Sequence, residues 1–205
     1  MKRGNEYIKN DLALISIASA VFFIFMAIIL TCPSIAYYDW KILHFVQDCM
    51  RNVPMVTGKW ISNFGMERYG IWPAIVAGCV LASHQKYVPA IFLPLFVRMT
   101  WAVAYFFQDI THRIQPNGVD VHSFPSAHTL AAAVAFGLIA ACAYRYVGNS
   151  AWRNALITSA ILWILTVGWC RVWLGMNYPS DVISSWMLGV VFVYVYIVIL
   201  KLFNR

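Results

Sequence analysis

Charged side chains are scarce in this chain of 205 residues. Asp, Glu, Lys and Arg make up 11% of it, whereas 61% of its residues are hydrophobic. A typical soluble domain carries about 25% charged residues. One soluble core cannot hide this much apolar surface. The composition therefore excludes an ordinary soluble domain and predicts an integral membrane protein whose solvent is lipid.

Metal-binding and redox motifs are missing as well. None of the five cysteines belongs to a CxxC pair, and three of them lie in apolar runs, where a cysteine is typically a small buried hydrophobe. We therefore expect neither a metal site nor a cofactor. The sequence also lacks internal repeats and low-complexity segments, so residues 1–205 are predicted to form a single membrane domain.

The chain has a series of long apolar runs instead. Six of them are typical of membrane-spanning helices. They cover residues 12–31, 66–83, 87–107, 127–146, 154–171 and 182–203. The sequence therefore predicts an all-α fold, an integral membrane six-helix bundle.

A shorter helix is expected between the first two spans. Apolar residues recur there at helical spacing, with charged and polar residues between them. These apolar residues are Ile42, Phe45, Val46, Cys49 and Met50. The pattern predicts a short amphipathic helix that lies in the membrane interface.

The net charge of +7 is unevenly distributed along the chain. With a cytoplasmic N-terminus, the inner segments carry eight cations and two acidic residues, a balance of +6, while the outer segments carry six of each. This asymmetry follows the positive-inside rule and explains the basic charge better than nucleic-acid binding does. We expect a bacterial inner-membrane protein with both termini in the cytoplasm and with loops 108–126 and 172–181 on the extracytoplasmic side.

Polar residues concentrate in these two outer loops. In the first loop, Pro125-Ser126 directly precedes an apolar run, which predicts a helix capped by Ser126 with His128 in its first turn. A helix N-terminus is a natural binding site for phosphate. The second loop lies between Arg171, which closes the fifth span, and Asp181, which opens the sixth. Together these residues predict an oxyanion pocket.

A plainer interpretation of the loops stays open at this point. Short outer loops of membrane proteins hold polar residues simply because they contact water. The long side chain of Arg171 can likewise extend along apolar surface to the interface without binding any ligand.

The same two loops resemble signature motifs of the type 2 phosphatidic acid phosphatase family, whose members are integral-membrane lipid phosphatases. The family's second motif, P-S-G-H, corresponds to PSAH at Pro125–His128. Its third motif, S-R-x5-H-x3-D, corresponds to CRVWLGMNYPSD at 170–181, and its first, K-x6-R-P, ends at Pro116. The resemblance implies that the substrate or ligand is a lipid phosphate or pyrophosphate, isoprenoid phosphates included.

Family roles carry over to several residues. In the family, the second-motif His protonates the leaving oxygen, the third-motif His attacks phosphorus while the Asp orients it, and basic residues bind the phosphate. By resemblance, His128 is the acid, Asp181 the orienting carboxylate and Arg171 a phosphate ligand. Ser126 and Ala127, which replaces the motif's Gly, belong to the phosphate-binding helix start.

The departures from the motifs affect catalysis directly. Asn177 occupies the position of the nucleophilic His, and an Asn amide nitrogen has no basic lone pair with which to form a phosphohistidine. Gln108 and Gln115 stand where the first motif has Lys and Arg, so a charged phosphate is held more weakly. Arg113, close by in sequence, is a partial substitute for these cations.

Three interpretations follow, and they leave open whether the chain is an enzyme. It is a divergent member that binds a lipid phosphate without cleaving it, or that works by another route. It is an active phosphatase whose nucleophile was replaced by design. It is a structural subunit that keeps only the fold.

The sequence leaves the roles of three further residues open. The loop histidines His112 and His122 are alternative nucleophiles. Arg98 lies within the third predicted span, where a charge is costly and usually paired. We expect it to pair with Glu67, to stack on Trp101, or to reach the pocket as a ligand.

The charge asymmetry leads to a test of orientation. In a variant that lacks the native cysteines, Gly118→Cys is expected to react with a membrane-impermeant thiol reagent added to intact cells. Asn149→Cys is expected to react only after the membrane is permeabilised. The measurement is the extent of labelling at each position, and the reverse pattern would place both polar loops in the cytoplasm.

Overall fold

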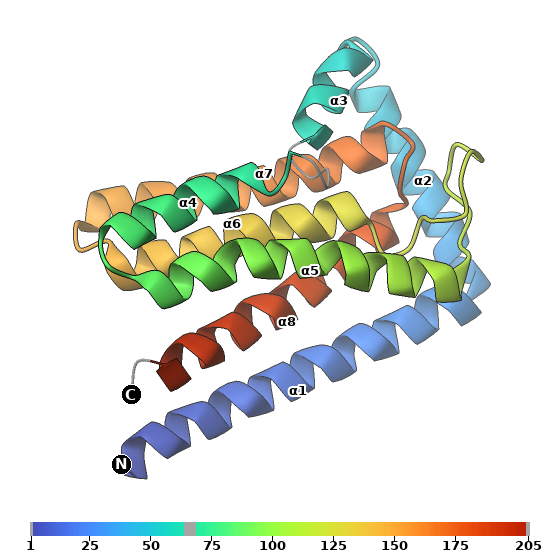
Figure 1. Cartoon of the computed structure of the whole chain (residues 1–205). Helices are drawn as coiled ribbons and strands as arrows, with labels where there is room; N and C mark the ends of the chain where they lie inside the picture. Colours follow the sequence, from blue (N-terminus) through green and yellow to red (C-terminus); the bar gives the residue numbers. More distant parts are fainter. Residues whose placement is uncertain (1, 64–68, 204–205) are drawn as a thin grey trace.

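The protein is all-helical throughout the parts that the computed structural model describes, residues 2–63 and 69–203. Eight α-helices follow one another within these ranges (Figure 1). They are α1 (Lys2–Thr31), α2 (Pro33–Cys49), α3 (Met55–Asn63), α4 (Trp72–Ser83), α5 (Tyr87–Thr111), α6 (Ala127–Tyr146), α7 (Ser150–Trp173) and α8 (Pro179–Phe203). The expectation of an all-α membrane fold is confirmed.

Five of these helices are long and apolar enough to cross a membrane: α1 from Asn10 onward, α5, α6, α7 and α8. The expected count of six is not reached in the described residues, because α4 has 12 residues. A helix of that length spans about 18 Å, whereas the hydrocarbon core of a bilayer is about 30 Å thick. Residues 66–68, the start of the expected second span, lie outside the described residues.

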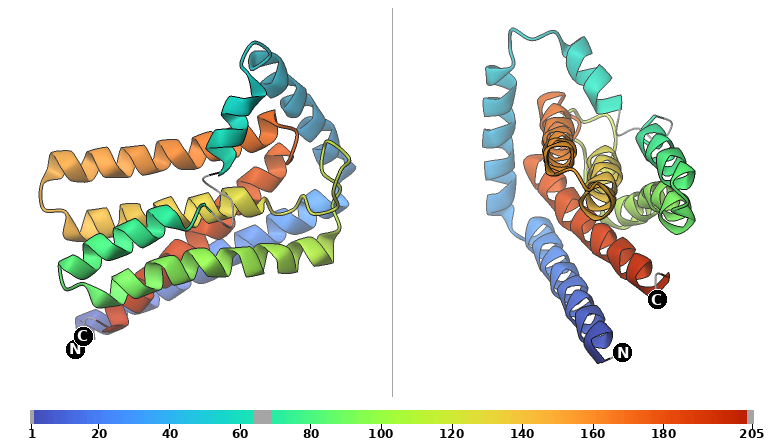
Figure 2. Two further views of the ribbon diagram at one scale, coloured as in Figure 1. Left: turned by 45° about the horizontal axis from the view of Figure 1, so that its top comes forward. Right: turned by 90° about the vertical axis from the view of Figure 1, so that its left-hand side faces the viewer.

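Helix α6 lies at the centre of the bundle. Seen from the end of the bundle, it is surrounded by α4, α5, α7 and α8 (Figure 2). Its side chains are mostly small, and its buried residues include Ala131, Ala132 and Ala135. A Cβ atom at Gly189 of α8 would meet the Cβ of Ala133 at 2.8 Å. Small residues of this kind let membrane helices approach closely, and they fix the position of α6.

Helix α2 crosses one end of the bundle (Figure 1). The helix forms in the expected segment, and its two faces differ. Leu43 and Val46 are buried and pack against α7 and α8, together with Asp39, which is 3% exposed. Phe45 is 63% exposed, and Ile42, which is 46% exposed, lines a groove beside α7 and α8. The outward apolar face suits a helix in the membrane interface, which stays a prediction.

The α5–α6 and α7–α8 loops meet at the end of the bundle that α2 crosses. The backbone N–H of Asn117 donates to the carbonyl oxygen of Gly175 over 3.1 Å. Gly175 turns the chain between α7 and α8 with a φ of +65°, a conformation that glycine adopts without steric cost. The start of α1 and the end of α8 lie together at the other end, where Lys201 Nζ is 2.5 Å from Asp11 Oδ2.

Candidate functional site

Ser126 fixes the start of α6 through two hydrogen bonds, one within the first turn and one to the α7–α8 loop. Ser126 is the N-cap, and its hydroxyl oxygen accepts a hydrogen bond from the N–H of Thr129 over 3.4 Å. The same hydroxyl donates to Asn177 Oδ1 over 2.9 Å. Ser126 is completely buried. It therefore caps the helix, as the sequence indicated, and its side chain does not reach the cavity described next.

A polar cavity of about 220 Å³ opens beside this helix start. Its walls come from α5, the α5–α6 loop, α6, α7 and the α7–α8 loop. The lining residues are Trp101, Tyr105, Gln108, Gln115, Asp120, His122, Ala127, His128, Arg171 and Asn177. Six of the nine expected site residues thus line one cavity, which we call the polar pocket.

The three expected residues outside the lining are Ser126, Arg113 and Asp181. Ser126 and Asp181 still touch the site, since Ser126 bonds Asn177 and Asp181 bonds residues next to the pocket. Arg98 is exposed on α5 and does not line the pocket. Glu67, its expected partner, lies outside the described residues.

Arg171 and Asn177 form the floor of the polar pocket. Both are buried, with exposed fractions of 7% and 1%. Arg171 Nε donates to Asn177 Oδ1 over 2.8 Å, and Asn177 Nδ2 donates to the carbonyl oxygen of Ser123 over 2.7 Å. Since Ser126 also donates to Oδ1, both ends of the Asn177 amide are bonded to the protein. The side chain that replaces the nucleophile is part of the framework.

Segment 123–126 is held through four successive carbonyl oxygens. Asn177 bonds the first. Thr111 Oγ1 donates to the second, of Phe124, over 3.1 Å, and Gln108 Nε2 to the third, of Pro125, over 2.9 Å. Ser185 Oγ donates to the fourth, of Ser126, over 3.0 Å. Gln108 and Asn177, two of the departures from the family motifs, thus share the task of fixing the chain in front of α6.

His128 projects from the first turn of α6 into the polar pocket. Its ring packs edge-on against Trp101, with 5.3 Å between the ring centroids. The ring faces the same cavity as Arg171. This placement agrees with the expected role of a proton donor above a bound phosphate, and the role itself stays a prediction.

Asp181 is fully buried and does not line the polar pocket. Its Oδ2 accepts from Ser123 Oγ over 2.5 Å and from the N–H of Tyr178 over 2.8 Å. Its Oδ1 accepts from Arg113 Nη1. Among the described residues neither oxygen bonds Asn177, so this carboxylate orients Arg113 where the family's Asp orients a histidine.

Arg113 is fully engaged outside the polar pocket. Its Nη2 donates to Asp39 Oδ2 over 2.7 Å, and its Nη1 donates to Ser180 Oγ over 2.8 Å as well as to Asp181. Its guanidinium carbon also lies 4.5 Å from the ring centroid of Tyr178. Burial opposes the charge, yet the two carboxylates outweigh it and raise the pKa of Arg113. Because its donors are used here, Arg113 does not supply the cation that the pocket lacks.

Sequence reasoning missed Asp39 as a site residue. Its Oδ1 accepts from the N–H of Ser180 over 3.0 Å, and its Oδ2 from Ser180 Oγ over 2.5 Å. A carboxylate from α2 thus satisfies an unpaired N–H in the first turn of α8, where negative charge is favourable. The sequence showed only that an Asp lies in a predicted amphipathic helix. It gave no indication of which residue that Asp contacts.

His122 is the second histidine that lines the polar pocket. Its Nδ1 lies 2.5 Å from Asp120 Oδ1, and its Nε2 lies 3.6 Å from Asp109 Oδ1. The hydrogen bond with His122 lowers the pKa of Asp120, and an ionised carboxylate acts only as an acceptor. His112 is exposed at the end of α5 and does not line the pocket.

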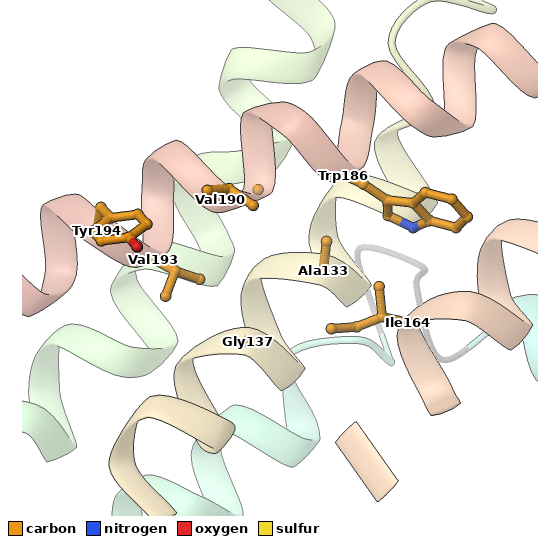
Figure 3. Close-up of a pocket in the computed structure, with 8 residues that line it drawn as sticks. Ala133, Gly137, Ile164, Trp186, Val190, Val193 and Tyr194 are labelled. Atoms are coloured by element: carbon orange, nitrogen blue, oxygen red, sulfur yellow. The ribbon is translucent and has the colours of Figure 1, made fainter. Parts of the chain in front are cut away.

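A separate groove between α6, α7 and α8 has a volume of about 280 Å³ (Figure 3). Ala133, Gly137, Ile164, Val190 and Val193 form most of its wall. Its lining residues carry no charged side chain. In the described ranges, no three His, Cys, Asp or Glu side chains are placed to hold a metal ion.

Comparison with known proteins decides the family. The PAP2 superfamily model matches residues 16–205. The chain belongs to the PAP2 superfamily. The resemblance to type 2 phosphatidic acid phosphatases is thereby confirmed. With its five long apolar helices, this PAP2 protein is an integral membrane protein.

The fold of this PAP2 protein is also seen in a solved structure. The crystal structure is of a transmembrane PAP2-type phosphatidylglycerolphosphate phosphatase from Bacillus subtilis. The TM-score is 0.79 at 18% sequence identity, and the match covers 89% of this chain and 93% of the other. At that identity the likeness shows a shared fold. No curated protein matches the chain.

The contacts of Asp39 lead to a test of stability in this PAP2 protein. Asp39→Asn removes the negative charge that pairs with Arg113 and accepts hydrogen bonds from Ser180 at the start of α8. We expect a loss of about 2 kcal/mol, which lowers the melting temperature in detergent by about 4–8 °C. Asp48→Asn, at an exposed position of the same helix, is the control and should change little. Equal melting of the two variants would contradict the proposed importance of Asp39.

Proposed function

We propose that this PAP2 protein binds the phosphate or pyrophosphate group of a membrane lipid in the polar pocket and lacks the family's covalent route of hydrolysis. The single observation that carries the proposal is the buried amide of Asn177, which is bonded at both ends in the place of the nucleophile. An amide nitrogen has no basic lone pair with which to attack phosphorus, and these bonds hold the side chain in place.

Anion binding follows from two features of the polar pocket. Arg171 brings a guanidinium to its floor, and guanidinium groups form strong charge-assisted hydrogen bonds with phosphate. The first-turn N–H groups of Ala127 and His128 have no carbonyl partner within the helix, and a helix N-terminus favours an anion. About 220 Å³ suits a phosphate group and is below the usual size of a pocket for a drug-sized ligand. The rest of the lipid would stay in the membrane.

The lipid class and the sidedness belong to this proposal as well. The family consists of lipid phosphatases, and the structural relative is described as acting on phosphatidylglycerolphosphate. We infer a lipid phosphate or isoprenoid phosphate ligand for this chain. The charge asymmetry supports an extracytoplasmic pocket in a bacterial inner membrane, with α4 and the residues before it as a sixth span.

Several observations favour natural divergence over the other two interpretations. Replacement of the nucleophile by design would not account for Gln108 and Gln115, which also depart from the family motifs. Asp181, in turn, has Arg113 as its ionic partner. A purely structural subunit would have no use for a cavity lined by Arg171 and His128. The chain is therefore proposed to be a lipid-phosphate-binding member with impaired or absent hydrolysis.

Restoring the nucleophile tests this proposal. Asn177→His alone is expected to release little phosphate from lipid phosphates, because Gln108 and Gln115 leave the transition-state charge under-neutralised. The triple variant Asn177→His/Gln108→Lys/Gln115→Arg should be at least about 100-fold faster, since each missing cation costs a large factor in rate. The measurement is phosphate release from a panel of phosphatidic acid, phosphatidylglycerol phosphate and polyprenyl pyrophosphate.

Binding is measured in parallel on the unmodified chain with the same lipids. Arg171→Gln should weaken binding by about tenfold or more, while Arg51→Gln, at an exposed position outside the pocket, should not. Full activity of Asn177→His alone would support an engineered phosphatase. No binding by the unmodified chain would contradict the proposal and favour a structural subunit.

Slow hydrolysis by another base is a second candidate function, supported by the bond between His122 and Asp120. With its Nδ1 proton held by Asp120, His122 can take a proton at Nε2 from a water molecule. The water oxygen attacks phosphorus, the bond from phosphorus to the lipid oxygen breaks, and His128 protonates that oxygen. A covalent enzyme intermediate is not needed.

Two histidine variants test this second candidate. Any slow phosphate release by the unmodified chain should fall by about 100-fold in His122→Asn, because a general base contributes at least that factor. His112→Asn is the matched control, since His112 is exposed and lies outside the pocket. Equal rates in the two variants would exclude His122 as the base and leave the binding proposal untouched.

A further inference from the structure

The end of the bundle opposite the polar pocket contains a large cavity of its own. It lies between α4, the start of α5, the end of α6 and α7, where the α4–α5 and α6–α7 turns come together (Figure 1). Its volume is about 520 Å³. Leu81, Ile139, Cys142 and Leu156 form apolar walls, and Lys86 lies at the rim. We call it the basal cavity.

Two cations, Lys86 and Arg145, lie beside the basal cavity, and Arg153 is nearby at the start of α7. Lys86 Nζ and the guanidinium carbon of Arg145 each lie 5.8 Å from the ring centroid of Tyr146, which itself lines the cavity. Arg153 lies 5.9 Å from the ring centroid of Tyr144. Segments 83–90 and 143–156 contain no Asp or Glu. Among the described residues, no carboxylate forms an ion pair with these three cations.

Exposed aromatic residues place this end of the bundle at the membrane surface. Tyr87, Tyr144 and Trp152 are between 62% and 74% exposed, and such residues concentrate at the level of lipid headgroups. The basal cavity therefore opens where a headgroup meets its acyl chains. The positive-inside rule accounts for basic residues in these turns, but it does not by itself place two of them on a ring that lines a cavity.

We propose that the basal cavity is a second lipid site, which binds an anionic phospholipid with part of an acyl chain against its apolar walls and with the phosphate near Lys86 and Arg145. A zwitterionic lipid would bring its ammonium group into the same cationic cluster, so the charge pattern selects against it. This site is separate from the polar pocket, and the inference does not depend on the proposed function.

Lipid binding to the purified chain in detergent tests the site. Phosphatidylglycerol and phosphatidylcholine with identical acyl chains are titrated, and bound lipid is counted by native mass spectrometry. The unmodified chain should prefer phosphatidylglycerol by about tenfold, since each basic residue near a membrane surface strengthens binding of anionic lipid severalfold. Lys86→Gln/Arg145→Gln should reduce that preference to less than about twofold. The control, Arg51→Gln/Lys59→Gln, has the same charge change at two exposed residues elsewhere and should keep it.

A variant that fills the basal cavity separates a true site from simple surface attraction. Val80 lines the cavity and is 55% exposed, so Val80→Trp can occupy part of it with little risk to folding. We expect Val80→Trp to weaken phosphatidylglycerol binding by about tenfold with all cations in place. A preference that survives Lys86→Gln/Arg145→Gln would overturn the proposal. Unchanged binding in Val80→Trp would also overturn it, because the lipid would then bind by surface charge alone.

Discussion

The guanidinium of Arg113 is the group on which the end of the bundle with the polar pocket depends. It pairs with Asp39 from α2 and with Asp181 from α8, and it comes from the loop that leads to α6. Three distant segments of the chain therefore converge on one partly buried cation. Removal of either carboxylate leaves several buried or partly buried donors without an acceptor, which costs more than a typical ion pair contributes. The loops that form the walls of the polar pocket are positioned by this ionic cluster and not by apolar packing alone.

The departures from the PAP2 motifs form a consistent set once their contacts are known. Gln108 and Asn177 each donate an amide hydrogen to a carbonyl in segment 123–126, which leads directly into the first turn of α6. Asp181, freed from orienting a histidine, accepts from Arg113 and Ser123 instead. Groups that perform chemistry in the family thus become groups that hold the backbone. His128 and Arg171 still line the polar pocket beside them.

The sequence predicted most of the helices, and six of the residues that it singled out line the polar pocket. Apolar runs define the membrane helices, since a backbone in lipid must satisfy its own hydrogen bonds, and the motif loops lie at the ends of those runs. The short α4 and the exposed α3 have weaker signals. The sequence could not predict which way the Arg113 side chain points, because its partner Asp39 is 74 residues away. A local pattern says nothing of where an amphipathic helix such as α2 will cross the bundle.

Loss of charge in the polar pocket affects hydrolysis more than binding. A phosphate in its ground state needs only the guanidinium of Arg171 and the amide end of α6, both of which line the pocket. Phosphoryl transfer requires more positive charge in the pocket, because charge on the three equatorial oxygens and on the leaving oxygen must be stabilised together. Neutral Gln108 and Gln115 do not contribute that charge, and Asn177 provides no attacking atom. Catalysis requires tighter binding of the transition state than of the ground state. The proposal of binding without efficient turnover therefore rests on which of these groups the polar pocket contains.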